Sequence, residues 1–184
     1  MLQRERTLIL VEGALLIAIA ALLNVIKFNG PWAFGGSVSL EMVPIIVFAL
    51  RRGFKWGIFA GLIYGIINFI MGPYFLNPIQ FLLDYLLAFL LLGFAGLVKV
   101  RSDVSRVWTL SMVASGAIFA MVLRFLSSFV SGIVFYGSNA PKGQPVALYS
   151  LIYNGSYMLP SMIISLIVLF ILAVSVPKFL VRRS

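Results

Sequence analysis

Hydrophobic residues fall into six runs along this chain, and short polar segments separate them. The runs cover residues 8–26, 39–50, 56–72, 79–98, 107–136 and 150–176. An α-helix needs about 20 apolar residues to cross the hydrocarbon core of a bilayer, with a range of roughly 17–25. The pattern therefore predicts an all-α integral membrane bundle of six transmembrane helices, with residues 1–184 forming a single domain.

Two runs differ in length from a standard span. The run 39–50 is short, so we expect its helix to be tilted, partly buried by its neighbours, or extended by residues 36–38. The run 107–136 is longer than the hydrocarbon core requires. One end of that helix is therefore expected to project beyond the lipid.

Basic residues mark one side of the predicted bundle. Eleven of the 14 Lys and Arg residues lie near the two termini and in the connections 51–55 and 99–106. The alternate connections, 27–38, 73–78 and 137–149, contain only two. Because cytoplasmic loops of membrane proteins carry the excess of basic residues, both termini are predicted to lie in the cytoplasm of a bacterium.

A cleaved signal peptide is the alternative interpretation of the first run. Ala18-Ile19-Ala20 resembles a small-x-small cleavage site. Cleavage there would leave five spans and break the alternation of basic residues. The six-span interpretation is therefore preferred.

Composition narrows the possible functions. The chain is 62% hydrophobic and 10% charged, whereas soluble domains carry about 25% charged residues. The net charge of +9 does not indicate a nucleic-acid partner, because the basic residues lie in short clusters between apolar runs. The expected surroundings are the lipid bilayer.

The absence of Cys and His argues against catalysis. Without these residues the chain has no zinc site of the usual kind and no Ser–His–Asp triad. We therefore expect no catalytic residues, no metal and no enzyme activity. The sequence also lacks a G-x-x-x-x-G-K-[ST] phosphate loop, so ATP for active transport would have to be used by partner subunits.

Four ionisable residues lie within the predicted spans: Glu12, Glu41, Asp84 and Arg124. A charge at mid-helix costs roughly 2.5–3.5 kcal/mol on insertion scales, so such residues usually have a task. In the simplest interpretation Asp84 and Arg124 pair with each other, and the two glutamates are structural groups near helix ends.

Polar residues in the outer halves of three spans predict a ligand pocket. Gln80 and Asp84 share one helix face, Arg124 and Ser128 share another, and Asn154 lies beside a row of tyrosines at 149, 153 and 157. Carboxylates and tyrosine faces suit a flat, cationic or amine-bearing ligand. The tyrosines could instead form an interfacial aromatic belt, and Trp32 could be an interface anchor.

Small residues at four-residue spacing predict close helix contacts. Gly57, Gly61 and Gly65 form one such row, which we expect to pack within the bundle. Ala14 and Ala18 form another on the first helix, and this pair could meet a different subunit.

Several stretches together resemble the thiamine-specific substrate-binding subunit, or S component, of energy-coupling-factor vitamin transporters. They are Gly35-Gly36-Ser37-Val38-Ser39, Pro44 with Leu50-Arg51-Arg52-Gly53, the run from Pro78 to Tyr85, Ala140-Pro141-Lys142-Gly143, and the run from Tyr149 to Gly155. The resemblance implies an outer ligand pocket covered by the first outer loop. It also implies three partners, a membrane coupling protein and two ATPases, with Ala14 and Ala18 contacting the coupling protein.

The resemblance also implies roles for individual residues. Asp84 would hold an aminopyrimidine ring, while Ser128 and Tyr136 stand where members often carry His and Trp. The complete predicted substrate-binding set is Asp84, Tyr149, Asn154, Arg124, Ser128, Tyr136, Tyr74, Gln80, Glu41 and Trp32. Hydroxymethyl pyrimidine or a pyridoxine-like ring remains an alternative ligand. A stand-alone small membrane transporter or channel remains an alternative function.

Overall fold

Long apolar helices account for most of the chain in a computed structural model, which describes residues 2–32, 35–101 and 103–182. The main helical segments are α1 (Leu2–Val25), α2 (Met42–Arg52), α3 (Phe54–Met71), a composite segment over Pro78–Leu97, α6 (Arg106–Phe135) and α7 (Val146–Ser175). Five of these, all except α2, are long and apolar enough to cross a membrane. The all-α membrane bundle expected from the sequence is confirmed.

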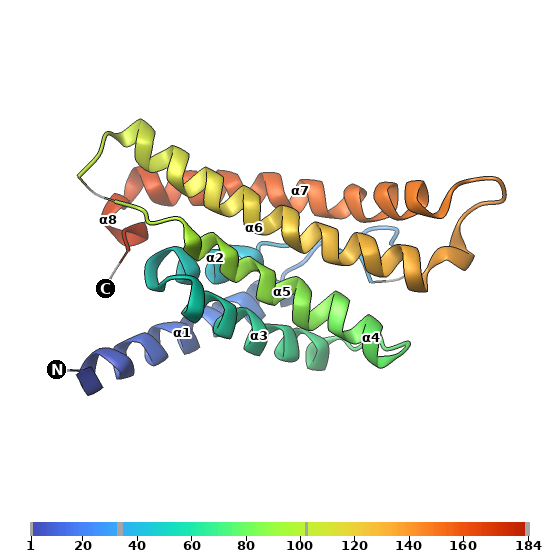
Figure 1. Cartoon of the computed structure of the whole chain (residues 1–184), viewed down its shortest axis with the longest axis horizontal. Coiled ribbons are helices and arrows are strands. Elements are labelled where there is room, and N and C mark those ends of the chain that lie inside the picture. The colour runs from blue at the N-terminus through green and yellow to red at the C-terminus, as the bar shows by residue number, and fades with distance from the viewer. Residues whose placement is uncertain (1, 33–34, 102, 183–184) are drawn as a thin grey trace.

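Both chain termini lie toward the same end of the bundle. Figure 1 shows them on the left, while α4 and the connection between α6 and α7 lie at the opposite end. The short helix α8 (Pro177–Leu180) follows α7 at the end that holds the termini. Helices α6 and α7 have 30 residues each, which corresponds to about 45 Å and exceeds the hydrocarbon core of a bilayer.

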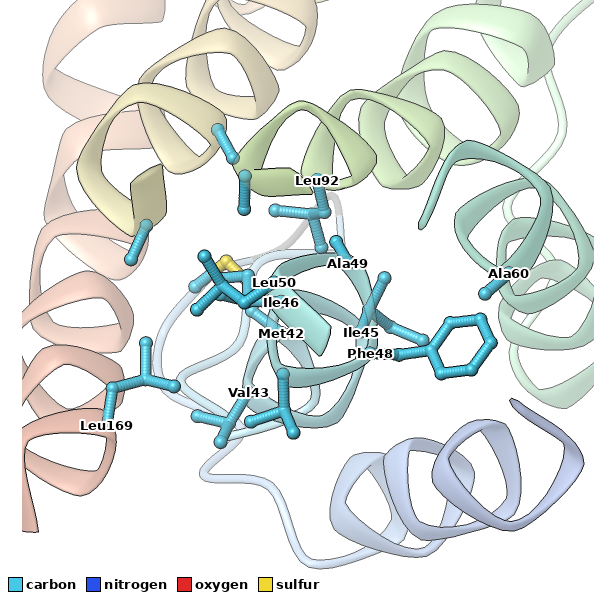
Figure 2. Packing of buried hydrophobic residues seen from close by; sticks show 14 of the residues in the cluster. Met42, Val43, Ile45, Ile46, Phe48, Ala49, Leu50, Ala60, Leu92 and Leu169 are labelled. Atoms are coloured by element: carbon cyan, nitrogen blue, oxygen red, sulfur yellow. The ribbon is translucent and has the colours of Figure 1, made fainter. Parts of the chain in front are cut away.

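Helix α2 is the centre of the hydrophobic core. Ten of its 11 residues are buried, and its side chains point toward the surrounding helices (Figure 2). A helix of this length cannot span a bilayer alone, but neighbouring helices shield it from lipid, as expected. Of the alternatives considered, the extension by residues 36–38 is wrong, because α2 begins at Met42 and Val38 forms an antiparallel bridge with Phe28.

The composite segment changes helix type three times. It consists of α4 (Pro78–Phe81), a π-helix η1 (Leu82–Leu87), α5 (Ala88–Leu90) and a 3₁₀-helix η2 (Leu91–Leu97). Such changes alter the backbone hydrogen bonds, which must be satisfied inside a membrane protein. Ser127 of α6 meets this need by donating to the carbonyl of Leu83 at 2.6 Å. π-Helical turns often occur at functional sites, and this one carries Asp84.

The glycine row of α3 packs within the bundle, as predicted. A Cβ atom on Gly65 would lie 2.6 Å from the carbonyl oxygen of Tyr85, and one on Gly61 would lie closer still to that of Phe89. A Cβ atom on Gly57 would lie 3.0 Å from the Cα of Gly93. Glycine therefore allows α3 and the composite segment to approach backbone to backbone.

Charged residues join α1 to α2 at the end that holds the termini. Glu12 of α1 forms ion pairs with Arg51 and Arg52 at the end of α2, the latter at 2.5 Å. Arg51 also donates to the carbonyl of Phe179 and lies over its ring at 4.5 Å. Glu12 therefore has the structural role considered from the sequence, because it joins α1 to α2.

Candidate ligand-binding site

A polar cavity lies in the half of the bundle away from the termini. Its walls come from the α1–α2 connection, α3, the π-helix, α6 and α7. Its volume is about 130 Å³, roughly ten times what a single water molecule needs. Seven residues of the predicted set line it: Glu41, Asp84, Arg124, Ser128, Tyr136, Tyr149 and Asn154.

Asp84 is held by neutral hydrogen-bond donors. Gln80, which is 1% exposed, donates from Nε2 to Asp84 Oδ2 at 2.6 Å. The Tyr136 hydroxyl lies 3.4 Å from the same oxygen. Within the described ranges, no Lys or Arg nitrogen lies within 4.0 Å of this carboxylate. Asp84 is therefore oriented toward the cavity without a protein cation to neutralise it.

Arg124 pairs with Glu41, so the alternative in which Arg124 and Asp84 simply pair with each other is wrong. Arg124 Nη2 lies 2.9 Å from Glu41 Oε1, and its guanidinium group sits 4.1 Å above the Phe89 ring centroid. Tyr64 and Asn68 donate to the other carboxylate oxygen of Glu41 at 2.7 and 3.0 Å. The Glu41 carboxylate therefore has the additional hydrogen bonds that a buried ion pair requires, whereas Arg124 Nε is buried without a hydrogen-bond partner among the described residues.

The short length of α2 explains the position of Glu41. Glu41 immediately precedes α2, and a helix of 11 residues starts well inside the bundle rather than at its surface. A residue next to this helix start is therefore 5% exposed and borders the cavity. The sequence placed Glu41 correctly at a helix end but did not reveal the depth of that end.

Tyrosines form an aromatic wall on α7. Tyr149, Tyr153 and Tyr157 follow one another at four-residue intervals, and their consecutive ring centroids lie 5.9 and 6.0 Å apart. All three line the cavity, which differs from the lipid-facing arrangement of an aromatic belt. Tyr157 also donates to Asn154 Oδ1 at 2.6 Å, while Asn154 Nδ2 donates to the Ser150 carbonyl at 3.0 Å. These bonds fix the orientation of the Asn154 amide.

Three residues of the predicted set stand behind the cavity lining. Gln80 supports Asp84, and Tyr74 stacks on Tyr136 with ring centroids 6.1 Å apart. Trp32 packs edge-on against Tyr157 at 5.7 Å and donates to Ser156 Oγ at 2.7 Å. Each therefore supports a residue of the lining or of the helix that carries it.

Other lining residues were not included in the predicted set. Lys27, Asn68, Tyr85 and Ser150 border the cavity. Asn68 could have been recognised, because it lies four residues after Tyr64 and its amide interrupts the apolar second half of α3. Lys27, Tyr85 and Ser150 could not have been recognised, because their sequence neighbours resemble those of many residues outside the site.

A helical membrane bundle with a cavity lined by carboxylates and tyrosines defines a class of protein, the membrane proteins that bind a small organic molecule. The sequence identifies the member of this class more closely. The chain belongs to the thiamine transporter protein family, whose sequence profile matches residues 10–181. It is thus a multi-pass bacterial membrane protein of a transporter family.

Individual relatives agree with this assignment. The thiamine transporter ThiT of Bacillus subtilis (strain 168) is 37% identical over 187 residues, which cover 97% of this chain and 96% of the relative. ThiT of Lacticaseibacillus paracasei is 32% identical over 196 residues, covering 100% and 96%. A solved structure of ThiT from Listeria monocytogenes matches with a TM-score of 0.86 at 33% identity, over 97% of this chain and all of that one. The resemblance found in the sequence is confirmed.

Proposed function

We propose that this chain captures thiamine in the polar cavity, as the substrate-binding subunit of an importer. The observation that carries the proposal is the Asp84 carboxylate, which faces the cavity beside tyrosine rings and has no protein cation within 4.0 Å among the described residues. A buried carboxylate of this kind requires a partner that brings donors or positive charge. The aminopyrimidine and thiazolium rings of thiamine supply both.

The two ends of the cavity suit the two rings of thiamine. The amino group and a protonated ring nitrogen of the pyrimidine would donate to Asp84, in charge-assisted hydrogen bonds that are about twice as strong as neutral ones. The cationic thiazolium would lie among the tyrosines of α7, where each cation–π contact contributes about 0.5–2 kcal/mol. Arg124 would stay with Glu41, so that it adds no net positive charge beside the ligand.

The first helix offers a surface for the coupling protein. Ala14 and Ala18 are exposed, and they border an apolar groove of about 430 Å³ between α1 and α3. Small residues on an exposed face permit another helix to approach closely in lipid. We assign this groove to a membrane coupling protein, which would connect the subunit to two ATPases that use the ATP.

A titration of the purified protein with three ligands tests the proposal. The ligands are thiamine, hydroxymethyl pyrimidine and pyridoxine. Binding of each to the protein in detergent is measured by calorimetry. Thiamine should bind with one site per chain and more tightly than the others, because only thiamine occupies both parts of the cavity. Tighter binding of hydroxymethyl pyrimidine would assign the site to the precursor. Binding of pyridoxine alone would contradict the proposed role of Asp84.

A further inference from the structure

A second groove lies at the end of the bundle that holds the termini. It runs between the start of α6 and the junction of α7 with α8, and its volume is about 340 Å³. Three basic side chains border it, from Arg101, Arg106 and Lys178. Its apolar part includes Val174, Pro177 and Val181. The groove thus combines positive charge with a hydrophobic surface.

Most of the positive charge in this groove has no acidic partner among the residues that the structure describes. Arg101 forms an exposed ion pair with Asp103. Neither Arg106 nor Lys178 has an acidic partner in the described part of the chain. Arg182 is nearby in sequence, but its guanidinium group donates to the carbonyls of Gly96 and Val98. Two cations therefore remain to attract an anion.

The surroundings place the groove at the surface of the membrane. Val107 and Trp108, which follow Arg106 in the first turn of α6, are 72% and 64% exposed. Tryptophan is enriched where the hydrocarbon meets the headgroups, and basic residues are enriched on the cytoplasmic side of that boundary. The groove is therefore expected to lie at the headgroup level of the inner leaflet.

We propose that this groove binds the headgroup of an anionic phospholipid. Arg106 and Lys178 would hold the phosphate, and the upper part of an acyl chain would lie along Val174, Pro177 and Val181. Basic pockets between membrane helices on the cytoplasmic side commonly bind acidic headgroups. The lipid would tie the start of α6 to the end of α7, at a site separate from the thiamine cavity.

Native mass spectrometry of the purified protein tests this proposal. The protein in detergent is titrated with phosphatidylglycerol and, separately, with phosphatidylcholine of the same acyl chains. Arg106→Gln combined with Lys178→Gln removes the two free cations. Arg4→Gln combined with Arg6→Gln is the matched control, because it removes the same charge outside the groove. Thermal unfolding of all three proteins shows whether the variants are folded.

The native protein should bind one phosphatidylglycerol more tightly than phosphatidylcholine. Each basic residue near an acidic membrane surface strengthens binding about fivefold, so the groove variant should lose about 25-fold and the control less than twofold. Equal loss in both variants would overturn the proposal, as would equal binding of the two lipids. If inorganic phosphate displaces phosphatidylglycerol when both are present at the same concentration, the site binds free phosphate instead. If only an acidic protein partner binds the groove, the proposal is also overturned.

Discussion

Replacing Asp84 by Asn tests the chemistry of the cavity with minimal change in shape. In the native protein, Asp84 accepts from Gln80 at 2.6 Å, and an Asn carbonyl oxygen can accept the same bond. The substitution therefore removes one negative charge and keeps the local packing. Since no basic residue lies within 4.0 Å of Asp84 among the described residues, no protein cation loses its partner. The fold is expected to survive.

The expected loss of affinity follows from the bond to the ligand. A hydrogen bond to a charged group contributes about 1.5–3 kcal/mol. Since about 1.4 kcal/mol corresponds to a factor of ten, Asp84→Asn should weaken thiamine binding about ten- to a hundredfold. Calorimetric titration of the purified variant measures this directly. Asp103→Asn is the matched control, because Asp103 is exposed and lies outside the cavity, and it should leave the affinity unchanged.

A thiamine analogue with oxygen in place of the pyrimidine amino group separates two explanations. If Asp84 accepts from that amino group, the analogue should bind the native protein more weakly, and Asp84→Asn should reduce this difference. Unchanged thiamine affinity in a folded Asp84→Asn protein would show that the Asp84 carboxylate does not bind the ligand. An undiminished preference for thiamine over the analogue would show that another group recognises the amino group.

Four further predictions follow from the packing and the charge pattern. Glu41→Gln should lower the free energy of unfolding by about 3–5 kcal/mol, since it leaves a buried guanidinium group without its counter-ion; an unchanged thermal midpoint would contradict the pairing. Gly61→Ala should cost about 1–3 kcal/mol, whereas Gly72→Ala, where a Cβ meets nothing within 4 Å, should be close to neutral; equal effects would argue against backbone contact at Gly61. Ala14→Leu should block thiamine uptake by cells but preserve binding to the isolated subunit, and loss of binding would show that this alanine packs internally. A Cys introduced at Lys142 in this Cys-free chain should react with an impermeant reagent from outside the cell, and labelling only from inside would reverse the topology.

The positions of the long helices could be predicted because lipid imposes a simple rule. A helix exposed to lipid must be apolar over its length, so α3, α6 and α7 appear directly as hydrophobic runs. Helix α2 does not follow this rule, because protein surrounds it. Its short run was visible, but the depth at which it begins depends on the packing of its neighbours.

The contacts between charged residues of the site depend on the depth in the bundle at which each residue lies. Asp84 and Arg124 were each recognised as unusual charges, and Gln80 was placed on the helix face of Asp84, where it donates to the carboxylate. The pairing of Arg124 with Glu41 was not predicted, because pairing depends on which helices face each other and at what height. The π-helical turn that carries Asp84 has no clear signal in its sequence, Leu82-Leu83-Asp84-Tyr85-Leu86-Leu87. By contrast, the tyrosine row was found because its four-residue period matches one face of a helix.

The amount of thiamine that the purified protein retains shows whether the cavity captures thiamine. The native protein and a Tyr149→Ala/Asp84→Asn variant are purified with thiamine present, passed through a desalting column and denatured, and the released molecules are quantified by mass spectrometry. We expect about one thiamine per native chain and little in the variant, which should be folded as judged by its thermal transition. A folded native protein that retains no thiamine, or a variant that retains as much as the native protein, would contradict capture of thiamine in this cavity.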